Sequence, residues 1–186
     1  RSLVKADVQL ANNAVLAMYQ DEDANMWIGT YDGLHLYNGK NTFVFRMELD
    51  NEFSLCSNIV LEIAPAEKGY LWVATSLGIN KFSLRERRVV ESYMQYVDVE
   101  NIASDSEGNT VLFSGEDFIT CYRPGRAFFE DVYIPGVRAA EIVAVWSEAP
   151  RVFCTLGRDG ELVRYRLNDG EGKSLVRVSG RQLSAR

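Results

Sequence analysis

The side chains that most often perform catalysis are scarce in this sequence. Its 186 residues include one histidine, His35, which lies between two leucines in an apolar stretch. A metal cluster or a nucleophile–base pair built on histidine needs partners at suitable spacing, and none is evident. Glycine-rich loops of the kind that bind phosphate groups are also missing. We therefore expect no catalytic residue, no metal site and no cofactor, and interpret His35 as a packed or surface side chain on a strand.

One acidic cluster has oxygen ligands of the kind that calcium prefers. Residues 21–25 have the sequence DEDAN, which offers carboxylate and amide oxygens. The spacing differs from that of an EF-hand loop, and Asp and Asn are also common in turns. We therefore interpret residues 21–25 as a polar turn between two strands.

The three cysteines, Cys56, Cys121 and Cys154, are widely separated along the chain. A disulfide framework or a metal site usually shows closer spacing. Cys121 and Cys154 lie in apolar stretches, so we interpret the cysteines as small buried side chains. The spacing leaves their redox state open.

Two tryptophans could provide flat rings on which a sugar stacks. Trp27 and Trp72 lie 45 residues apart, at the same place in a repeated stretch. A residue that recurs in this way is expected where neighbouring repeats pack against each other. We therefore interpret both as core residues.

The repeat is clearest in two stretches. Residues 26–38 have the sequence MWIGTYDGLHLYN and residues 71–82 have LWVATSLGINKF, with Trp, Thr, Gly and an aromatic residue in matching places. Each stretch predicts two short strands around a tight turn. Asp32-Gly33 is typical of hairpin turns, because glycine readily adopts the positive φ that such turns need. Repetition at this period is typical of repeat architectures.

Four such units follow one another, each with four expected antiparallel strands, at about 13–47, 58–94, 99–133 and 141–179. Residues 3–10 alternate like a strand and are expected to be the outer strand of a preceding or shared unit. In the third unit, Leu112 is expected to replace the tryptophan. In the fourth, turns are expected at residues 147–150 and 156–161.

Tandem units of four short strands predict a β-propeller. Each small sheet is apolar on both faces, so it is stable only between neighbours. We predict no helix. Residues 85–92 have some helical character, but Val89-Val90 favours a strand there. We therefore predict an all-β protein, a single partial β-propeller of about four blades over residues 1–186.

The repeat resembles the two-component regulator propeller repeat. The residues that carry the resemblance are Asn13-Ala14-Val15, Asp21, Asn25–Thr30, Asp32-Gly33-Leu34 and Tyr37-Asn38, then Asn58-Ile59-Val60, Gly69, Leu71–Thr75 and Gly78-Ile79. The likeness is specific in the first two units and looser in the others. This repeat is typical of the periplasmic sensor region of Bacteroides-type hybrid two-component systems. There, two seven-bladed propellers and an immunoglobulin-like domain precede a membrane helix and a histidine kinase.

The resemblance implies a function in signalling. Proteins of this family sense oligosaccharides released from glycans, so we expect a non-catalytic, periplasmic sensing module of a larger histidine kinase. Four units do not complete a seven-bladed ring, and the chain does not begin with methionine. We therefore expect the remaining blades or a second copy as partners. Contact with the membrane is expected only through C-terminal segments outside this sequence.

The propeller topology places the expected ligand-binding residues. One face of such a ring collects the loops between successive blades and the turns between the second and third strands of each blade. Binding residues often lie on loops held by a rigid scaffold, and amide, carboxylate, guanidinium and phenol groups suit hydroxyl-rich ligands. The candidates are Asn13, Tyr31, Asp32, Asn51, Asn58, Ser76, Asn101, Glu116, Asp117, Arg158 and Asp159. The alternative is that they serve only as soluble turn residues.

Two other functions stay open. A propeller can be purely a protein-interaction or dimerisation platform, and exposed apolar faces on the first and last blades would favour partners. A propeller lyase is less favoured, because one histidine offers little for catalysis. The net charge of −6 argues against a nucleic-acid partner, which would require clustered Lys and Arg.

Overall fold

The computed structural model describes residues 14–93, 99–115, 118–126, 129–132, 134, 136–168 and 175–183. The strand expected over residues 3–10 and the candidate residues Asn13, Glu116 and Asp117 lie outside this part of the chain. Within the described residues, no helix has the length and apolar character needed to span a membrane.

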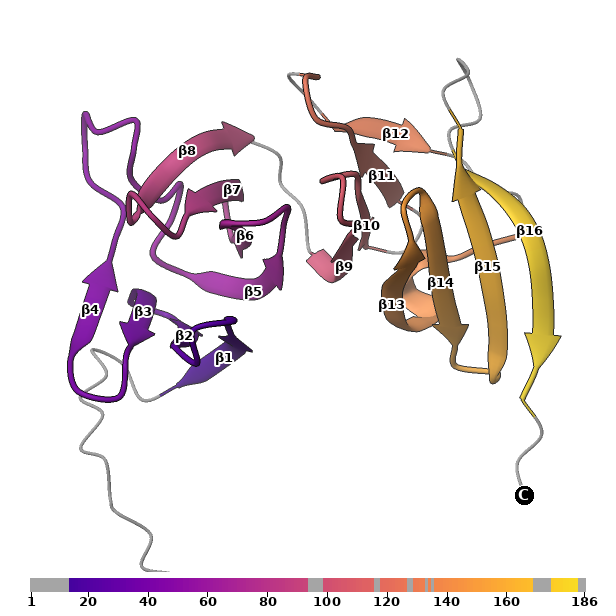
Figure 1. The fold of residues 1–186 in the computed structure, drawn as a ribbon, viewed down its shortest axis with the longest axis horizontal. Coiled ribbons are helices and arrows are strands. Elements are labelled where there is room, and N and C mark those ends of the chain that lie inside the picture. Colours follow the sequence, from indigo (N-terminus) through magenta and orange to yellow (C-terminus); the bar gives the residue numbers. More distant parts are fainter. Residues whose placement is uncertain are drawn as a thin grey trace, which may run out of the picture. The chain divides into compact units, whose positions relative to one another are not determined.

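The described residues fold into four sheets, each made of four antiparallel strands in sequence order (Figure 1). This confirms the predicted all-β architecture of four four-stranded blades. The residues group into two compact units, which are described separately. Of the described residues, unit 1 comprises residues 14–63 and 71–93, and unit 2 comprises residues 64–70 and those from 99 onward.

Blades 1 and 2 lie mainly in unit 1 and share one strand pattern. Their strands are β1 (Val15–Gln20), β2 (Met26–Thr30), β3 (Gly33–Tyr37), β4 (Thr42–Phe45), β5 (Val60–Pro65), β6 (Tyr70–Thr75), β7 (Gly78–Ser83) and β8 (Arg88–Tyr93). A threonine closes the central hairpin of each blade. Thr30 Oγ1 donates to the carbonyl of Gly33 at 3.2 Å, and Thr75 Oγ1 donates to the carbonyl of Gly78 at 2.8 Å. The sequence repeat therefore encodes the same turn twice.

The core of unit 1 forms where blade 1 packs against blade 2. Trp27 is 1% exposed, and its ring meets Phe82 edge-on with the ring centroids 5.4 Å apart. Gly29 lies at a close approach of the two blades, because a Cβ atom there would be 2.7 Å from Cγ1 of Val60. Trp72 is also buried. The interpretation of both tryptophans as core residues is confirmed.

Unit 2 contains blades 3 and 4. Their strands are β9 (Val99–Ser104), β10 (Thr110–Ser114), β11 (Phe118–Tyr122), β12 (Glu130–Val132), β13 (Ile142–Ala149), β14 (Val152–Gly157), β15 (Glu161–Leu167) and β16 (Leu175–Gln182). A short 3₁₀ turn, η1 (Ala139–Glu141), precedes blade 4 and is not among the predicted elements. The core of this unit includes Val111, Phe113, Cys121, Phe153, Val163 and Tyr165.

Val111, and not Leu112, takes the place of tryptophan in blade 3. Residues 105–109 form the same hydrogen-bonded turn as residues 21–25, so Val111 corresponds to Trp27. Val111 lies in the core of unit 2, whereas Leu112, as the next residue of the strand, points to the opposite face of the sheet. The prediction is wrong by one residue, because a run of apolar residues does not by itself define the register.

The strands of blade 4 are longer than predicted. The turn expected over residues 147–150 is mostly strand, since β13 continues to Ala149, and the turn expected over 156–161 shrinks to residues 158–160. Gly160, with a φ of +81°, donates its backbone N–H to the carbonyl of Gly157 at 3.0 Å and closes this tighter turn. Polar residues suggested wider turns, but Ser147, Glu148 and Glu161 lie in strands, and Glu148 is exposed there.

Candidate ligand-binding loops

His35 lies in β3 and is fully buried. Burial lowers the pKa of its imidazole, because the charged form would lose its hydration. The side chain is thus a packed one, which was one of the two expectations for it. A buried, neutral imidazole is poorly placed to act on a substrate.

The acidic turn over residues 21–25 is held together by Asp21. Its Oδ1 accepts the backbone N–H groups of Asp23 and Asn25 at 3.0 and 2.9 Å. Its Oδ2 accepts the Asn25 amide at 3.0 Å and the Trp27 indole N–H at 2.8 Å. Burial alone would raise the pKa of Asp21, but the hydrogen bonds from Trp27, Asn25 and Asp23 together lower it. Both carboxylate oxygens therefore serve the turn rather than an open cation site.

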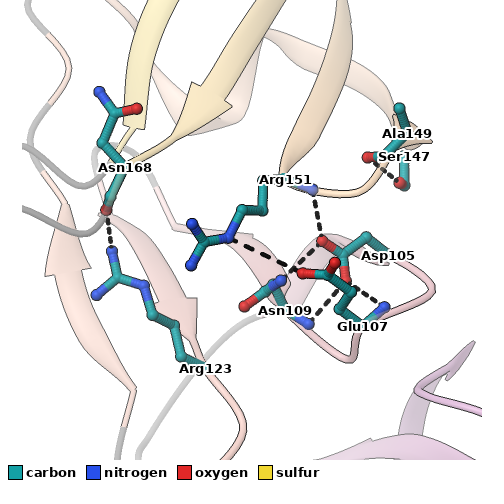
Figure 2. A network of polar contacts seen from close by, with 8 residues as sticks. All are labelled: Asp105, Glu107, Asn109, Arg123, Ser147, Ala149, Arg151 and Asn168. Atoms are coloured by element: carbon teal, nitrogen blue, oxygen red, sulfur yellow. Dashed lines mark hydrogen bonds and ion pairs between the residues drawn. The ribbon is translucent and has the colours of Figure 1, made fainter.

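Asp105 repeats this arrangement in unit 2 and adds a contact between blades (Figure 2). Its Oδ1 accepts the backbone N–H of Asn109 at 2.9 Å, and its Oδ2 accepts the amide of the same residue at 2.8 Å. Oδ2 of Asp21 accepts a hydrogen bond from the Trp27 indole N–H. Oδ2 of Asp105 instead accepts one, at 2.7 Å, from the backbone N–H of Arg151 in the β13–β14 turn of blade 4. Sequence reasoning identified the acidic turn but missed this contact, because any residue could supply the N–H.

A second set of bonds continues this network. The carbonyl of Arg151 accepts the backbone N–H of Leu167 at 2.8 Å. The carbonyl of the next residue, Asn168, accepts Nη2 of the buried Arg123 at 2.6 Å (Figure 2), and Arg123 also pairs with Glu130 at 3.1 Å. These hydrogen bonds join the β9–β10, β11–β12, β13–β14 and β15–β16 connections of unit 2. The polar residues that form them therefore have a structural role.

Three candidate residues gather at the central hairpin of blade 1. Asp32 and Arg46 form a bidentate pair, with Oδ1–Nε and Oδ2–Nη2 distances of 3.1 and 3.0 Å. The hydrogen bond from Arg46 is the main cause that lowers the pKa of Asp32. The carbonyl of Asn58 accepts the backbone N–H of Gly33 at 2.7 Å, and Tyr31 in the same turn is 52% exposed. A phenol, a carboxylate and a guanidinium therefore face solvent from one hairpin and its neighbouring strand.

Ser76 joins the same region and Asn51 is engaged elsewhere. Ser76 Oγ lies 2.8 Å from the Oγ of Ser57, which directly precedes Asn58 in the sequence. Asn51 donates its amide to the Glu48 carboxylate at 2.7 Å, within the loop that joins blades 1 and 2.

In unit 2, two candidate residues converge on η1. Asn101 Nδ2 donates to the carbonyl of Ile142 at 3.0 Å, and the backbone N–H of Arg158 donates to the carbonyl of Glu141 at 2.8 Å. Asp159 follows in the same turn and is exposed. These bonds give the residues structural partners, and their binding of a ligand stays a prediction.

A groove that the sequence reasoning did not anticipate lies in unit 1. It has a volume of about 520 Å³ and runs between β4, the loop that follows it and the start of β8. Its lining residues are Val44, Phe45, Arg46, Met47, Glu48, Asn51, Phe53, Ser54, Leu55, Phe82, Arg87, Arg88 and Val89. Arginines cluster in residues 85–88, and this cluster was the one sign of the groove in the sequence, where the stretch was predicted only as part of a strand.

Part of the first blade also matches a known protein family in its sequence. Residues 9–32 match the family model described as Two component regulator propeller. A comparison with curated proteins found no match.

Several solved structures share the fold of this chain. Two are extracellular domains from B. thetaiotaomicron assigned to the hybrid two component systems BT3049 and BT4673. The first is 20% identical, with a TM-score of 0.64 over 91% of this chain and 25% of its own length. The second is 19% identical, with a TM-score of 0.58 over 82% of this chain and 20% of its own.

PorZ of Porphyromonas gingivalis, an essential bacterial surface component of the type-IX secretion system, also has this fold. It is 12% identical, with a TM-score of 0.60 over 84% of this chain and 21% of its own length. The chain therefore spans a quarter or less of each of these three structures. At these identities the likeness shows the fold.

Proposed function

We propose that this chain is part of the extracytoplasmic sensing region of a hybrid two-component signalling protein and that it binds an oligosaccharide without catalysing a reaction. The two-component regulator propeller repeat at residues 9–32 carries this proposal. The shared fold with extracellular domains of two hybrid two component systems supports it. A periplasmic location and a histidine kinase elsewhere in a longer protein belong to the same proposal.

The ligand would bind on the hairpin turns of the blades. In unit 1, Tyr31, Asp32 and Asn58 lie around one hairpin, and Arg46 pairs with the second of them. Such a group offers a ring face for the C–H groups of a sugar, with hydrogen-bond donors and acceptors for its hydroxyls. In unit 2, Asn101, Arg158 and Asp159 would provide similar groups near η1.

The proposed signal is a shift in conformational population. A ligand favours whichever arrangement of the blades it binds more tightly, and the shift is limited by the difference in affinity. A change of packing in the sensing region would then alter the attached kinase across the membrane.

A protein-interaction platform is the second candidate function. Apolar side chains are exposed on β1, where Met18 is 64% exposed, and on β16, where Val178 is 52% exposed. Further blades or a second copy of the chain would cover such residues. Self-association without any glycan binding, measured by light scattering and calorimetry, would favour this function over the first.

Calorimetric titration of the chain with a panel of neutral and acidic oligosaccharides tests the sensing proposal. We expect binding of at least one, weakened about tenfold by Tyr31→Ala or Asp32→Ala through loss of a hydrogen-bonding or stacking group. Asp23→Ala, which removes an exposed carboxylate from a different turn, is the matched control and should bind normally. Absence of binding to the whole panel by a folded chain would contradict the proposal.

A further inference from the structure

We propose that the groove of unit 1 between β4 and β8 is a second ligand site, which binds the carboxylate groups of an acidic oligosaccharide. The inference rests on the proposed function in one respect, the choice of a sugar as the ligand. The groove shares Arg46 with the hairpin group of the proposed function, but the residue tested here, Arg87, lies outside that group.

The floor of the groove is apolar and fixed. Leu55, Phe82 and Val89 line it, and each is at most 2% exposed. The loop after β4 is held over β8, because the carbonyl of Phe53 accepts the backbone N–H of Val89 at 3.0 Å. An apolar floor of this kind suits the C–H face of a sugar ring.

Two arginines at the edge of the groove are stacked on aromatic rings. The guanidinium carbon of Arg88 lies 4.1 Å from the centroid of Phe53, and that of Arg87 lies 4.9 Å from the centroid of Phe43. Stacking fixes the plane of a guanidinium and leaves its N–H edge available to a carboxylate in bidentate geometry. The guanidinium groups at the edge of the groove can therefore donate hydrogen bonds to a carboxylate of the ligand.

Two of the three groove arginines already have carboxylate partners. Arg46 pairs with Asp32 at 3.0 Å, and Arg88 pairs with Glu86 at 2.5 Å. Arg87 forms no ion pair with any residue in the described part of the chain. A guanidinium carries only donors, so a ligand that pairs with Arg87 must supply acceptors, and a carboxylate supplies two in matching bidentate geometry.

The backbone of Arg87 is held in an unusual conformation. Its φ is +54°, in the left-handed region that residues other than glycine seldom adopt, and its N–H donates to the carbonyl of Ser83 at 2.8 Å. Such conformations persist where the surrounding structure imposes them, and they are common at ligand sites. Here the conformation belongs to a residue that lines the groove.

An extended peptide fits the groove less well than a sugar does. A peptide strand would pair with the free edge of β8 through backbone hydrogen bonds. The N–H of Val89 on that edge is already bonded to the carbonyl of Phe53. Pairing at this position is therefore blocked by the protein itself.

The test is calorimetric titration of the chain with a galacturonic acid trimer, a neutral galactose trimer and a short glutamate-rich peptide. The variant Arg87→Asn removes the guanidinium and keeps the backbone, since asparagine tolerates left-handed φ. Arg85→Asn, on the same turn but outside the groove lining, is the matched control. We expect the acidic trimer to bind, to lose about tenfold in affinity in Arg87→Asn and to bind normally in Arg85→Asn.

Further outcomes separate this inference from the proposed function. Equal binding of the neutral and acidic trimers, or normal acidic binding by Arg87→Asn, would overturn the groove site and leave sugar sensing at the hairpin turns intact. Preference for the peptide would overturn the choice of a sugar here. Absence of binding by either trimer would overturn the groove site, and only absence of binding by the whole oligosaccharide panel would overturn the proposed function as well. If Arg87→Asn unfolds, Arg87→Lys keeps the charge but loses the bidentate geometry, and weaker acidic binding in that variant would support the site.

Discussion

Asp105 accepts the backbone N–H of Arg151 at 2.7 Å, so a side chain of blade 3 is bonded to a turn of blade 4. In blade 1 the corresponding oxygen, Oδ2 of Asp21, accepts the indole N–H of Trp27 at 2.8 Å. The aspartate at this position of the repeat therefore accepts a hydrogen bond from its own blade in blade 1 and from the next blade in blade 3. The difference follows from the residue at the tryptophan position, because Val111 in blade 3 has no side-chain donor.

Removal of the Asp105 carboxylate should destabilise unit 2. Asp105→Ala leaves several buried N–H donors without an acceptor, and we expect a loss of about 3 kcal/mol in the free energy of unfolding. The control is Asp131→Ala, which removes an exposed carboxylate from β12 and should change stability by less than about 0.5 kcal/mol. Urea unfolding measures both, and similar values for the two variants would contradict the structural role of Asp105.

The Asp21 turn should make the stability of unit 1 depend on pH. The folded pKa of Asp21 is lowered, so its stabilising effect is complete above the ordinary value of 3.8 and is lost as the pH falls through the folded value. Asp21→Asn cannot titrate. We expect the gap in stability between the wild type and this variant to narrow as urea unfolding is repeated from about pH 6 down to about pH 2.5. A gap that is constant over this range would show that Asp21 contributes no pH dependence.

Gly29 should be intolerant of a side chain. In Gly29→Ala the new Cβ would lie 2.7 Å from Cγ1 and 3.0 Å from the carbonyl oxygen of Val60, so the two blades must separate slightly. We expect a cost of about 1–3 kcal/mol. Combination with Val60→Ala removes the first clash, and the double variant should be about 1 kcal/mol more stable than the sum of the single effects. Strict additivity in urea unfolding would argue against a packing conflict between these residues.

The cysteines should differ in reactivity. Burial raises the pKa of Cys121 to about 12 and also raises the pKa of Cys154, whereas Cys56 is only half-buried. The thiolate is the reactive form, so Cys56 should be alkylated first in the folded chain at about pH 8. Mass spectrometry of iodoacetamide-treated protein measures the order. Labelling of Cys121 as fast as Cys56 without unfolding would contradict its burial.

The repeat pattern was sufficient to predict the architecture. The 45-residue period, the hairpins around Gly33 and Gly78 and the buried positions of Trp27 and Trp72 are all properties of local sequence. They are predictable because a hairpin turn needs a residue that accepts positive φ, and because interblade packing repeats with each blade.

The strand register in blade 3 and the extent of the turns in blade 4 could be determined only from the structure. Val111 and Leu112 are both apolar and both buried, and only the hydrogen-bonded turn of residues 105–109 shows which of them takes the tryptophan position. The turn over residues 158–160 is tighter than its polar composition suggests, because Gly157 and Gly160 bond across it.

The sequence by itself determined the β-propeller repeat, its order of strands and the hairpin turns of blades 1 and 2, since these depend on neighbours along the chain. Only the tertiary structure decided that Asp105 bonds to Arg151, that Asn58 meets the turn of Gly33, and that Arg87 borders a groove with Phe53. Those relationships join residues far apart in sequence, and several use backbone N–H or carbonyl groups that every residue carries. A contact made by such groups depends on position in space, which the order of side chains alone does not specify.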